Sequence, residues 1–542
     1  RMFGRLQYKD PLKFSCFVKK GKCTKSHKEV SVVSSSQWNA SQLSAIDNIV
    51  RVNGCVMYSD SSPRVSVLNG PPGTGKSAVL IEIVKQLILL DGHRGKGMWV
   101  GSECNETVKE LVFKTQRKLG SKPFTFLVLG SPNNVDPSLH KYLYSTQCHD
   151  FKNCVERITK RDDLSERTLQ ELESYPWVPK DVMNAIRQQS NMKRVNRNRT
   201  VRASTMRRVL GLKKRERKTC PISDLFPANL TSMELENWVL NRCDVVFSTL
   251  CVAGSDLCRR HIFRTIVIDE AGHCIIPRIL NIVGADTKHL IVAGDPLQSD
   301  PLVKSQEAKD AGLDRSILTL LLGNDQNSIR EGVNAHFLNI QYRMVEEIAK
   351  FPLTHIYGGR VKTGREHAES SSYKVIDYST TRYEKHVGTS ICNYTETSLV
   401  MKYIKNRKGS ICVITPYVAQ VTCIQRLIQK SNIRNKIRVL TIDAMQGQEA
   451  DTVIISLVRC RRKSREAGFV KDIKRLTVAL TRARNNLIII GHRETLVPNI
   501  PLLDALFLDA ESRNVLTVLD MKRRPQHGKS FNRSRRRNVR GR

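Results

Sequence analysis

The sequence lacks several features that would place the protein in other classes. It contains no run of the ~18 apolar residues that a membrane-spanning helix needs, and its first apolar stretches are short and interrupted by lysine, unlike a secretory signal. Its 15 cysteines include no Cys-x-x-Cys pair, so they favour neither a disulfide framework nor a zinc site. We therefore expect no membrane partner and a reducing compartment, the cytoplasm or alternatively the nucleus.

Acidic residues are also scarce. Asp and Glu number 51 against 89 Lys and Arg, which gives a net charge of +38 and favours a polyanionic partner. Two segments carry much of the excess. Residues 187–218 contain 13 basic residues and one acidic residue, and residues 522–542 contain 10 basic residues and no acidic one. The second segment has almost no apolar residues, so we expect it to be a disordered basic tail.

The 542 residues suffice for about three or four domains. Because the chain begins with Arg1, we expect it to be part of a longer product. Short apolar segments alternate with helical patterns, which indicates parallel sheets covered by helices on both faces. The expected strands are 65–68, 98–100, 244–249, 264–268 and 290–293, followed by 410–415, 438–442, 452–456 and 486–491.

This alternation restarts once, so the sequence predicts two tandem α/β domains. We place the first at 39–330, with a helical and basic insertion at about 145–220, and the second at 331–500. The remaining parts are an N-terminal segment, 1–38, and a C-terminal extension, 501–542, which ends in the basic tail.

A phosphate-binding loop follows the first expected strand and opens a helix. The segment matches G-x-x-x-x-G-K-[ST], in the structural context that this motif requires. Its glycines allow backbone N–H groups to surround an anion. The lysine would reach the β- and γ-phosphates of a nucleotide, and the final hydroxyl would bind Mg²⁺. The loop consists of Gly70, Pro71, Pro72, Gly73, Thr74, Gly75, Lys76 and Ser77.

A pair of carboxylates follows the apolar strand 264–268. We expect Asp269 to complete the Mg²⁺ site and Glu270 to orient and deprotonate the attacking water. Two adjacent carboxylates at the end of a buried strand are costly unless a cation neutralises them. An isolated Asp-Glu pair is usually only solvated, but its position behind a strand, together with the phosphate loop, favours a metal site.

Six motifs in this order resemble superfamily 1 helicases over residues 39–492. The similarity is greatest to the RNA-acting branch that includes the nonsense-mediated-decay helicase, and the run Asp269–Cys274 resembles the Armitage-type helicases of small-RNA silencing. This resemblance implies two tandem RecA-like P-loop domains, ATP and Mg²⁺ as cofactors, and a remnant of an accessory barrel in 1–38. The motifs are Gly70–Ser77, Asp269–Gly272, Gly294–Gln298, Gln341–Arg343, Gly447–Glu449 and Ala479–Arg484.

The resemblance also implies roles for single residues. Gln42 would contact adenine, because its amide offers a donor and an acceptor, and Tyr342 would stack on the same base. Gln298 would sense the γ-phosphate. Glu449 would approach the ribose or a nearby arginine. Arg343 and Arg482 would reach the γ-phosphate from the second domain, where a planar guanidinium can bind phosphate oxygens in pairs.

Three further segments resemble the family's contacts to the nucleic-acid backbone: 101–107, 248–249 and 415–417. Hydroxyl and amide groups there would hold phosphate without recognising base sequence. The chain departs from the family pattern at Ser299, where leucine is usual, and at Thr477, where asparagine is usual. Neither position contacts the phosphates directly. The departures therefore bear on how tightly ATP hydrolysis is coupled to movement along the strand, and not on ATP binding itself.

We therefore interpret the chain as an ATP-driven 5′-to-3′ motor on single-stranded RNA or RNA–protein complexes, in small-RNA silencing or RNA decay. ATP would bind between the two domains, and both basic segments would be additional RNA contacts. For 187–218 the alternative is a solvated helical face, and for 522–542 it is a nuclear-import signal. Two other functions stay open: an ATP-gated RNA clamp or scaffold with little unwinding, and a DNA helicase, because backbone contacts alone do not report the 2′-hydroxyl.

Overall fold

The computed structural model describes residues 37–58, 64–89, 97–120, 124–160, 165–190, 239–323 and 329–521, with short gaps inside the last three ranges. The N-terminal segment up to residue 36, most of the basic run 187–218, Ser299 and the tail 522–542 lie outside the described residues. Among the described helices, none combines the length and the apolar character needed to cross a membrane.

The chain forms two compact units. The described part of unit 1 runs to Arg343 and includes Arg360–Gly364, and unit 2 comprises Met344–Gly359 and the residues from Arg365 onward. The boundary therefore falls after Arg343 and not at 330/331 as the sequence suggested. The reason is strand β7 (Val333–Phe337), which pairs in parallel with β1 (Arg64–Asn69) and so belongs to the first sheet.

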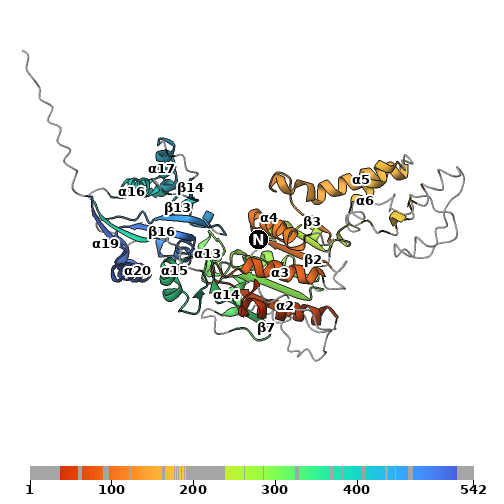
Figure 1. Ribbon diagram of the computed structural model, residues 1–542, viewed down its shortest axis with the longest axis horizontal. Helices are drawn as coiled ribbons and strands as arrows, with labels where there is room; N and C mark the ends of the chain where they lie inside the picture. Colours follow the sequence, from red (N-terminus) through yellow and green to blue (C-terminus); the bar gives the residue numbers. More distant parts are fainter. Residues whose placement is uncertain are drawn as a thin grey trace, which may run out of the picture. The chain divides into compact units, whose positions relative to one another are not determined.

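Unit 1 is built on a seven-stranded sheet in the order β3-β4-β2-β5-β6-β1-β7, and every neighbouring pair is parallel (Figure 1). The RecA-like, parallel-sheet architecture expected from the sequence is thus confirmed. The other strands are β2 (Met98–Ser102), β3 (Phe126–Val128), β4 (Val245–Thr249), β5 (Thr265–Ile268) and β6 (His289–Gly294). The main helices are α2 (Ala40–Tyr58), α3 (Lys76–Leu89), α4 (Asn105–Leu119), α5 (Tyr144–Lys160), α6 (Glu166–Ser174), α12 (Ile276–Leu280) and α14 (Ile317–Leu322).

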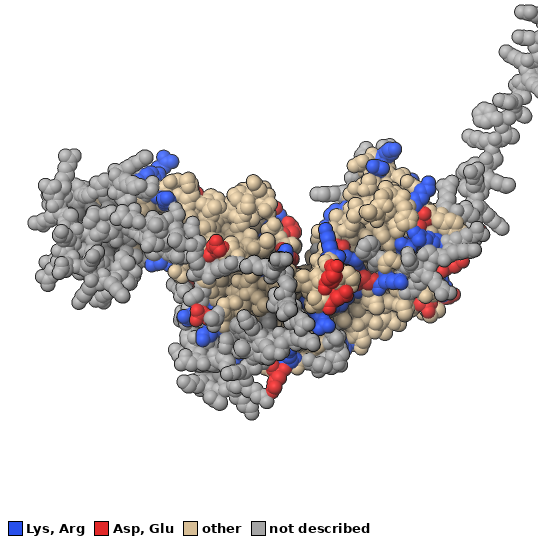
Figure 2. Space-filling model, turned by 180° about the vertical axis from the view of Figure 1, so that it is seen from behind, with Lys and Arg blue, Asp and Glu red and all other residues tan. Residues whose placement is uncertain are grey.

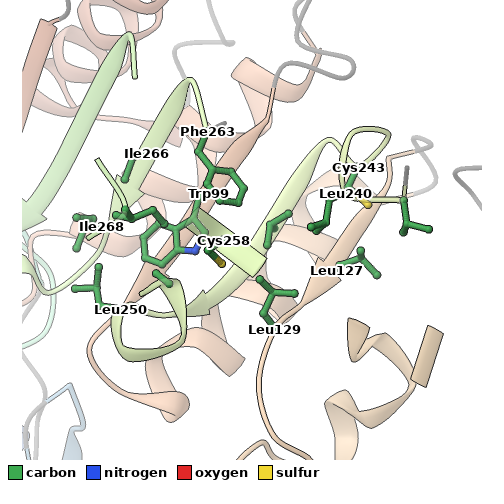
Figure 3. Packing of buried hydrophobic residues seen from close by; sticks show 14 of the residues in the cluster. Trp99, Leu127, Leu129, Leu240, Cys243, Leu250, Cys258, Phe263, Ile266 and Ile268 are labelled. Carbon is green, nitrogen blue, oxygen red and sulfur yellow. The ribbon is translucent and has the colours of Figure 1, made fainter. Parts of the chain in front are cut away.

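Both faces of this sheet are buried, because successive residues of a strand point to opposite sides. In β2, Met98 and Val100 join the apolar cluster that contains α2, α3 and α4, whereas Trp99 joins the cluster on the other face. Figure 3 shows Trp99 among Phe263, Ile266 and other apolar side chains of that second cluster. These two layers hold the strand ends, and therefore the loops that follow them, in fixed positions.

The described part of the predicted insertion is helical. Side chains of α5 and α6, including Phe151 and Leu172, belong to the same buried cluster as Trp99. The two helices are also joined by an ion pair between Arg157 and Glu171, with an N–O distance of 2.5 Å. Over this part, the insertion is therefore an extension of the core of unit 1.

Unit 2 carries a second parallel sheet, in the order β14-β13-β15-β16-β10-β17. Its edge strand β17 comes from the predicted C-terminal extension, so the second domain continues past residue 500. Two of these strands, β10 and β17, were not predicted from the sequence. The strands are β10 (Ser372–Ser379), β13 (Ile411–Thr415), β14 (Ile437–Thr441), β15 (Ala450–Ser456), β16 (Ala483–Gly491) and β17 (Leu516–Asp520), and the helices include α15 (Glu346–His355), α16 (Tyr394–Ile404), α17 (Val418–Gln429), α18 (Ile473–Leu480) and α20 (Pro501–Ser512).

A buried carboxyl group fixes the end of this second sheet. Glu396 accepts hydrogen bonds from Ser456 Oγ at 2.6 Å, from the Val458 N–H at 2.9 Å and from Tyr378 Oη at 2.9 Å. Burial raises the pKa of Glu396 to about 7, although these hydrogen bonds act in the opposite direction. Folded unit 2 therefore holds a proton at a pH where the unfolded chain has released it.

We expect this proton to make unit 2 less stable as the pH rises from about 4.5 to about 7. The slope can reach ~1.4 kcal/mol per pH unit. Replacing Glu396→Gln should remove this dependence. Urea unfolding followed by circular dichroism at several pH values measures it, and Glu511→Gln, at an exposed carboxylate paired with Arg493, is the matched control. Parallel pH profiles for the Glu396 variant and the parent would mean that Glu396 has no raised pKa.

Candidate functional site

The phosphate loop lies between β1 and α3, at the carboxyl edge of the first sheet. Gly73 and Gly75 have φ angles of 75° and 78°, in the left-handed region that favours glycine. Gly70 is restricted for another reason, because a Cβ atom there would lie 2.8 Å from the Lys76 Cβ. Thr74 is fully buried and closes the loop by donating its hydroxyl hydrogen to Pro71 O at 2.8 Å. Pro72 lies between them in the same turn.

The end of β5 brings two carboxylates to this loop. Lys76 Nζ lies 3.0 Å from Glu270 Oε1, and Ser77 Oγ donates to Asp269 Oδ2 at 2.9 Å. Four of the residues predicted for phosphate and metal chemistry therefore meet, although 192 positions separate Ser77 from Asp269.

Burial and charge act against each other in this cluster. Burial lowers the pKa of Lys76, but the carboxylates of Glu270, Asp269 and Asp295 outweigh it, so the pKa is raised overall. Burial, followed by the charge of Glu270, raises the pKa of Asp269. The Lys76 ammonium therefore keeps its positive charge. The negative charge of Asp269, next to that of Glu270, is only partly neutralised by this ammonium. An added cation would restore the balance.

Glu270 itself has a strained backbone. Its φ of 53° and ψ of 41° are left-handed, which few residues other than glycine adopt. It begins a short 3-10 helix, Ala271–His273, that leads into α12. Backbone strain of this kind persists only where the surroundings enforce it, and here it holds the carboxylate against the phosphate loop.

A third loop, at the end of β6, joins the cluster. The Gly70 N–H donates to Gly294 O at 2.9 Å, so the ends of β1 and β6 are in direct contact. Gln298 is buried and donates its amide hydrogen to Asp295 Oδ2 at 2.8 Å. Its predicted role at the γ-phosphate stays a prediction, but it does lie on the loop beside the phosphate site.

The residues predicted to hold the base lie together on unit 1. Gln42 Nε2 donates to Thr74 O at 3.0 Å, and Gln42 Oε1 accepts from the Asn39 N–H at 3.1 Å. Tyr342 is 44% exposed, its N–H donates to Gly73 O at 2.8 Å, and its hydroxyl accepts from Asn39 Nδ2 at 3.0 Å. An exposed ring beside the phosphate loop can stack on a base.

Arg343 also belongs to unit 1, whereas the sequence suggested the second domain. A Cβ atom on Gly73 would lie 2.6 Å from Arg343 Cβ, so the backbone of Arg343 passes directly against the phosphate loop. Its N–H donates to Gln341 Oε1 at 2.9 Å.

Unit 2 holds the other two predicted site residues. Arg482 is buried and its Nε donates to Val478 O at 3.1 Å, one turn earlier in α18. Glu449 accepts from Arg484 Nε at 2.9 Å. The proposed contacts of Arg482 and Glu449 with nucleotide remain predictions.

Comparisons with known proteins place this geometry in a family. Two family profiles, each described as an AAA domain, match residues 37–306 and 313–494. The probable helicase senataxin of Homo sapiens is 27% identical over 539 residues, which cover 88% of this chain and 19% of senataxin. The chain belongs to the superfamily 1 helicases. Within this superfamily of ATP-hydrolysing enzymes, it lies in the branch of Sen1 and regulator of nonsense transcripts 1.

Two other relatives of this helicase differ in what their names state. The DNA polymerase alpha-associated DNA helicase A of Saccharomyces cerevisiae is 27% identical over 80% of this chain and 63% of its own length. Regulator of nonsense transcripts 1 of Dictyostelium discoideum is 32% identical over 52% of this chain and 22% of its own length. The helicase chain thus spans less than two thirds of each of these relatives.

The residues present in this helicase fit Mg²⁺. The Ser77 hydroxyl and the Asp269 carboxylate are hard oxygen donors, and they already lie within hydrogen-bonding distance of each other. In the described part of the chain, no group of three or more His, Cys, Asp or Glu side chains surrounds one point. Mg²⁺ commonly binds through one or two protein oxygens together with phosphates and water, and this site suits that pattern.

The predicted backbone contacts are more buried than expected. Ser248 Oγ accepts from Trp99 Nε1 at 2.8 Å, and Tyr417 is only 4% exposed. In segment 101–107, by contrast, Cys104, Asn105 and Glu106 are exposed. The loop before α4 is therefore more accessible to a nucleic-acid strand than segments 248–249 and 415–417.

Sequence reasoning did not find one ion pair beside this loop. Glu103 pairs with Arg278, which α12 carries eight residues after Glu270. The Asp269 N–H also donates to Gly101 O at 2.9 Å. Two contacts thus join segment 101–107 to the segment that carries Asp269 and Glu270. No spacing in the sequence signals this pair, because its two members are far apart in the chain.

Proposed function

We propose that this helicase uses ATP hydrolysis to move 5′-to-3′ along single-stranded RNA, displacing paired strands or bound proteins. The observation that carries the proposal is the convergence of Lys76, Ser77, Asp269 and Glu270 on one phosphate loop. Lys76 would bind the phosphates, Asp269 and Ser77 would hold the metal, and Glu270 would accept the proton of the attacking water. Bound Mg²⁺ would neutralise charge that develops on the phosphates.

RNA as the strand is supported by the charge of the chain and by one relative. The net charge of +38 suits any nucleic acid. The word transcripts in the name of regulator of nonsense transcripts 1 favours RNA, and so does the resemblance of Asp269–Cys274 to silencing helicases. We propose RNA decay or small-RNA silencing as the process. The cytoplasm is the proposed compartment, with the nucleus as the alternative, and the described cysteines are free thiols, as suits both.

A second candidate is a DNA helicase. The observation that favours it is the similarity to DNA helicase A, which extends over 80% of this chain. ATPase assays with matched single strands of RNA and DNA distinguish the two functions. Stronger stimulation by RNA is the expected result, and stimulation by DNA alone would contradict it.

A duplex with a single-stranded overhang at either end tests movement. We expect ATP-dependent displacement from a 5′ overhang and none from a 3′ overhang. ATP hydrolysis without displacement from either substrate would instead support the clamp or scaffold function.

A further inference from the structure

One end of unit 2 presents an exposed patch that the ATP chemistry does not use. We call it the α16–α17 patch and define it by Lys385, Val387, Tyr394 and Val418. Val387 is 51% exposed, Tyr394 is 49% exposed and Val418 is 65% exposed. Large apolar side chains exposed together on one surface commonly mark a binding site.

Four elements bring these side chains together. A small hairpin pairs β11 (Lys385–Val387) with β12 (Ser390–Cys392), which places Lys385 opposite Cys392 and Val387 opposite Ser390. The Ala419 N–H, in the first turn of α17, donates to Ser390 Oγ at 3.1 Å. Lys385 Nζ lies 5.6 Å from the ring centroid of Tyr394, the first residue of α16.

The patch carries positive charge without exposed acid. The acidic residues on or next to these elements, Glu384 and Glu396, both have buried side chains. Glu384 pairs with Arg461 at 2.6 Å, and Glu396 lies in the hydrogen-bonded cluster described above. In Figure 2, the tip of unit 2 that carries α17 shows blue and tan surface. A polyanion suits this composition better than an acidic or purely apolar partner.

The position of the patch connects it to the predicted strand contacts. Segment 415–417 ends β13 and leads into α17, and ligands of parallel sheets bind at the carboxyl ends of strands. Tyr417, the aromatic residue of that segment, cannot stack on a base because it is buried with its hydroxyl 3.5 Å from Arg459 Nη1. Tyr394, whose ring lies beside Lys385 Nζ, is one of the exposed aromatic side chains of unit 2.

We propose that Tyr394 is a stacking platform for an unpaired base of the bound single strand, with Lys385 as a contact to its phosphates. Aromatic rings with nearby cations bind single strands without selecting sequence, since every base has a flat face. The inference rests on the proposed function. It adds a stacking contact with a base on unit 2, whereas the strand contacts predicted from the sequence involve only the sugar-phosphate backbone of the nucleic acid.

Fluorescence anisotropy with two labelled strands of about 15 nucleotides tests the platform. One strand is oligouridine, and the other has the same backbone without bases. Tyr394→Ala should weaken binding of oligouridine on the order of 5- to 100-fold and leave the abasic strand unaffected, whereas Tyr394→Phe should bind like the parent. Lys385→Ala should weaken both strands and reduce the salt slope by about 0.7.

The control is Tyr403→Ala, at the other end of α16, where Lys402 Nζ lies 5.8 Å from the tyrosine ring. If Tyr394→Ala weakens binding of both strands equally, or weakens binding of neither strand, the stacking proposal is wrong. Oligouridine binding that Tyr403→Ala weakens as much as Tyr394→Ala also overturns it. If the unaltered protein binds neither strand, the proposed function fails instead.

Discussion

Lys76→Ala should reduce ATP hydrolysis by at least about 10²-fold, the loss expected when one donor to the developing charge is removed. The ammonium group is the part of the Lys76 side chain that can reach phosphate, and alanine ends at Cβ. Steady-state ATPase at saturating single-stranded RNA measures the loss. Lys85→Ala is a matched control, because Lys85 lies on the same helix and pairs with Glu82 at 2.9 Å, away from the phosphate loop.

The same variant should also be less stable without nucleotide. Lys76 is the cation that the charges of Glu270, Asp269 and Asp295 surround, and removing one partner of a buried ion pair costs about 3–5 kcal/mol. Mg²⁺ should therefore stabilise Lys76→Ala more than the parent. Lys76→Arg keeps the charge, so it should restore stability but not hydrolysis. If Lys76→Arg hydrolysed ATP at the parental rate, any cation at this position would suffice.

The sequence predicted the strands that carry motifs and missed those that complete the sheets. Strands such as 264–268 are continuous apolar runs bounded by turns, which is the pattern of a strand buried on both faces. Strand β7 has the sequence VNAHF and only half-buried residues, and β17 lies at a sheet edge with Val518 exposed. Both strands lie at sheet edges and are only partly buried, so their apolar pattern is weak. The misplaced domain boundary follows from β7.

The candidate site shows a similar division. Lys76, Ser77, Asp269 and Glu270 could be predicted because the chemistry of phosphate fixes their spacing and their local context. The contact of Asn39 with Tyr342, and the pairing of Glu103 with Arg278, depend on which loops the sheet brings together. Burial of Tyr417 was also unpredictable, because the sequence TPY fits an exposed turn equally well.

Glu270→Gln should leave ATP binding intact and reduce turnover on the order of 10²–10⁴-fold, the contribution of a general base. The amide keeps the shape of the side chain and its Oε1 can still accept from Lys76, so the left-handed backbone at this position needs no change. It cannot take a proton from water. The ATP-bound form should then persist, and RNA should dissociate more slowly with ATP than without it.

Single-turnover hydrolysis and RNA dissociation rates measure these two effects separately. Glu110→Gln is the control, since it removes a carboxylate paired with a lysine on the exposed face of α4. Hydrolysis at the parental rate would show that another group activates the water. Asp269 is a poor substitute, because it is buried and its two oxygens already accept from Ser77 Oγ and the Glu270 N–H. Loss of ATP binding would show instead that the carboxylate of Glu270 positions Lys76, so the two readouts separate water activation from lysine orientation.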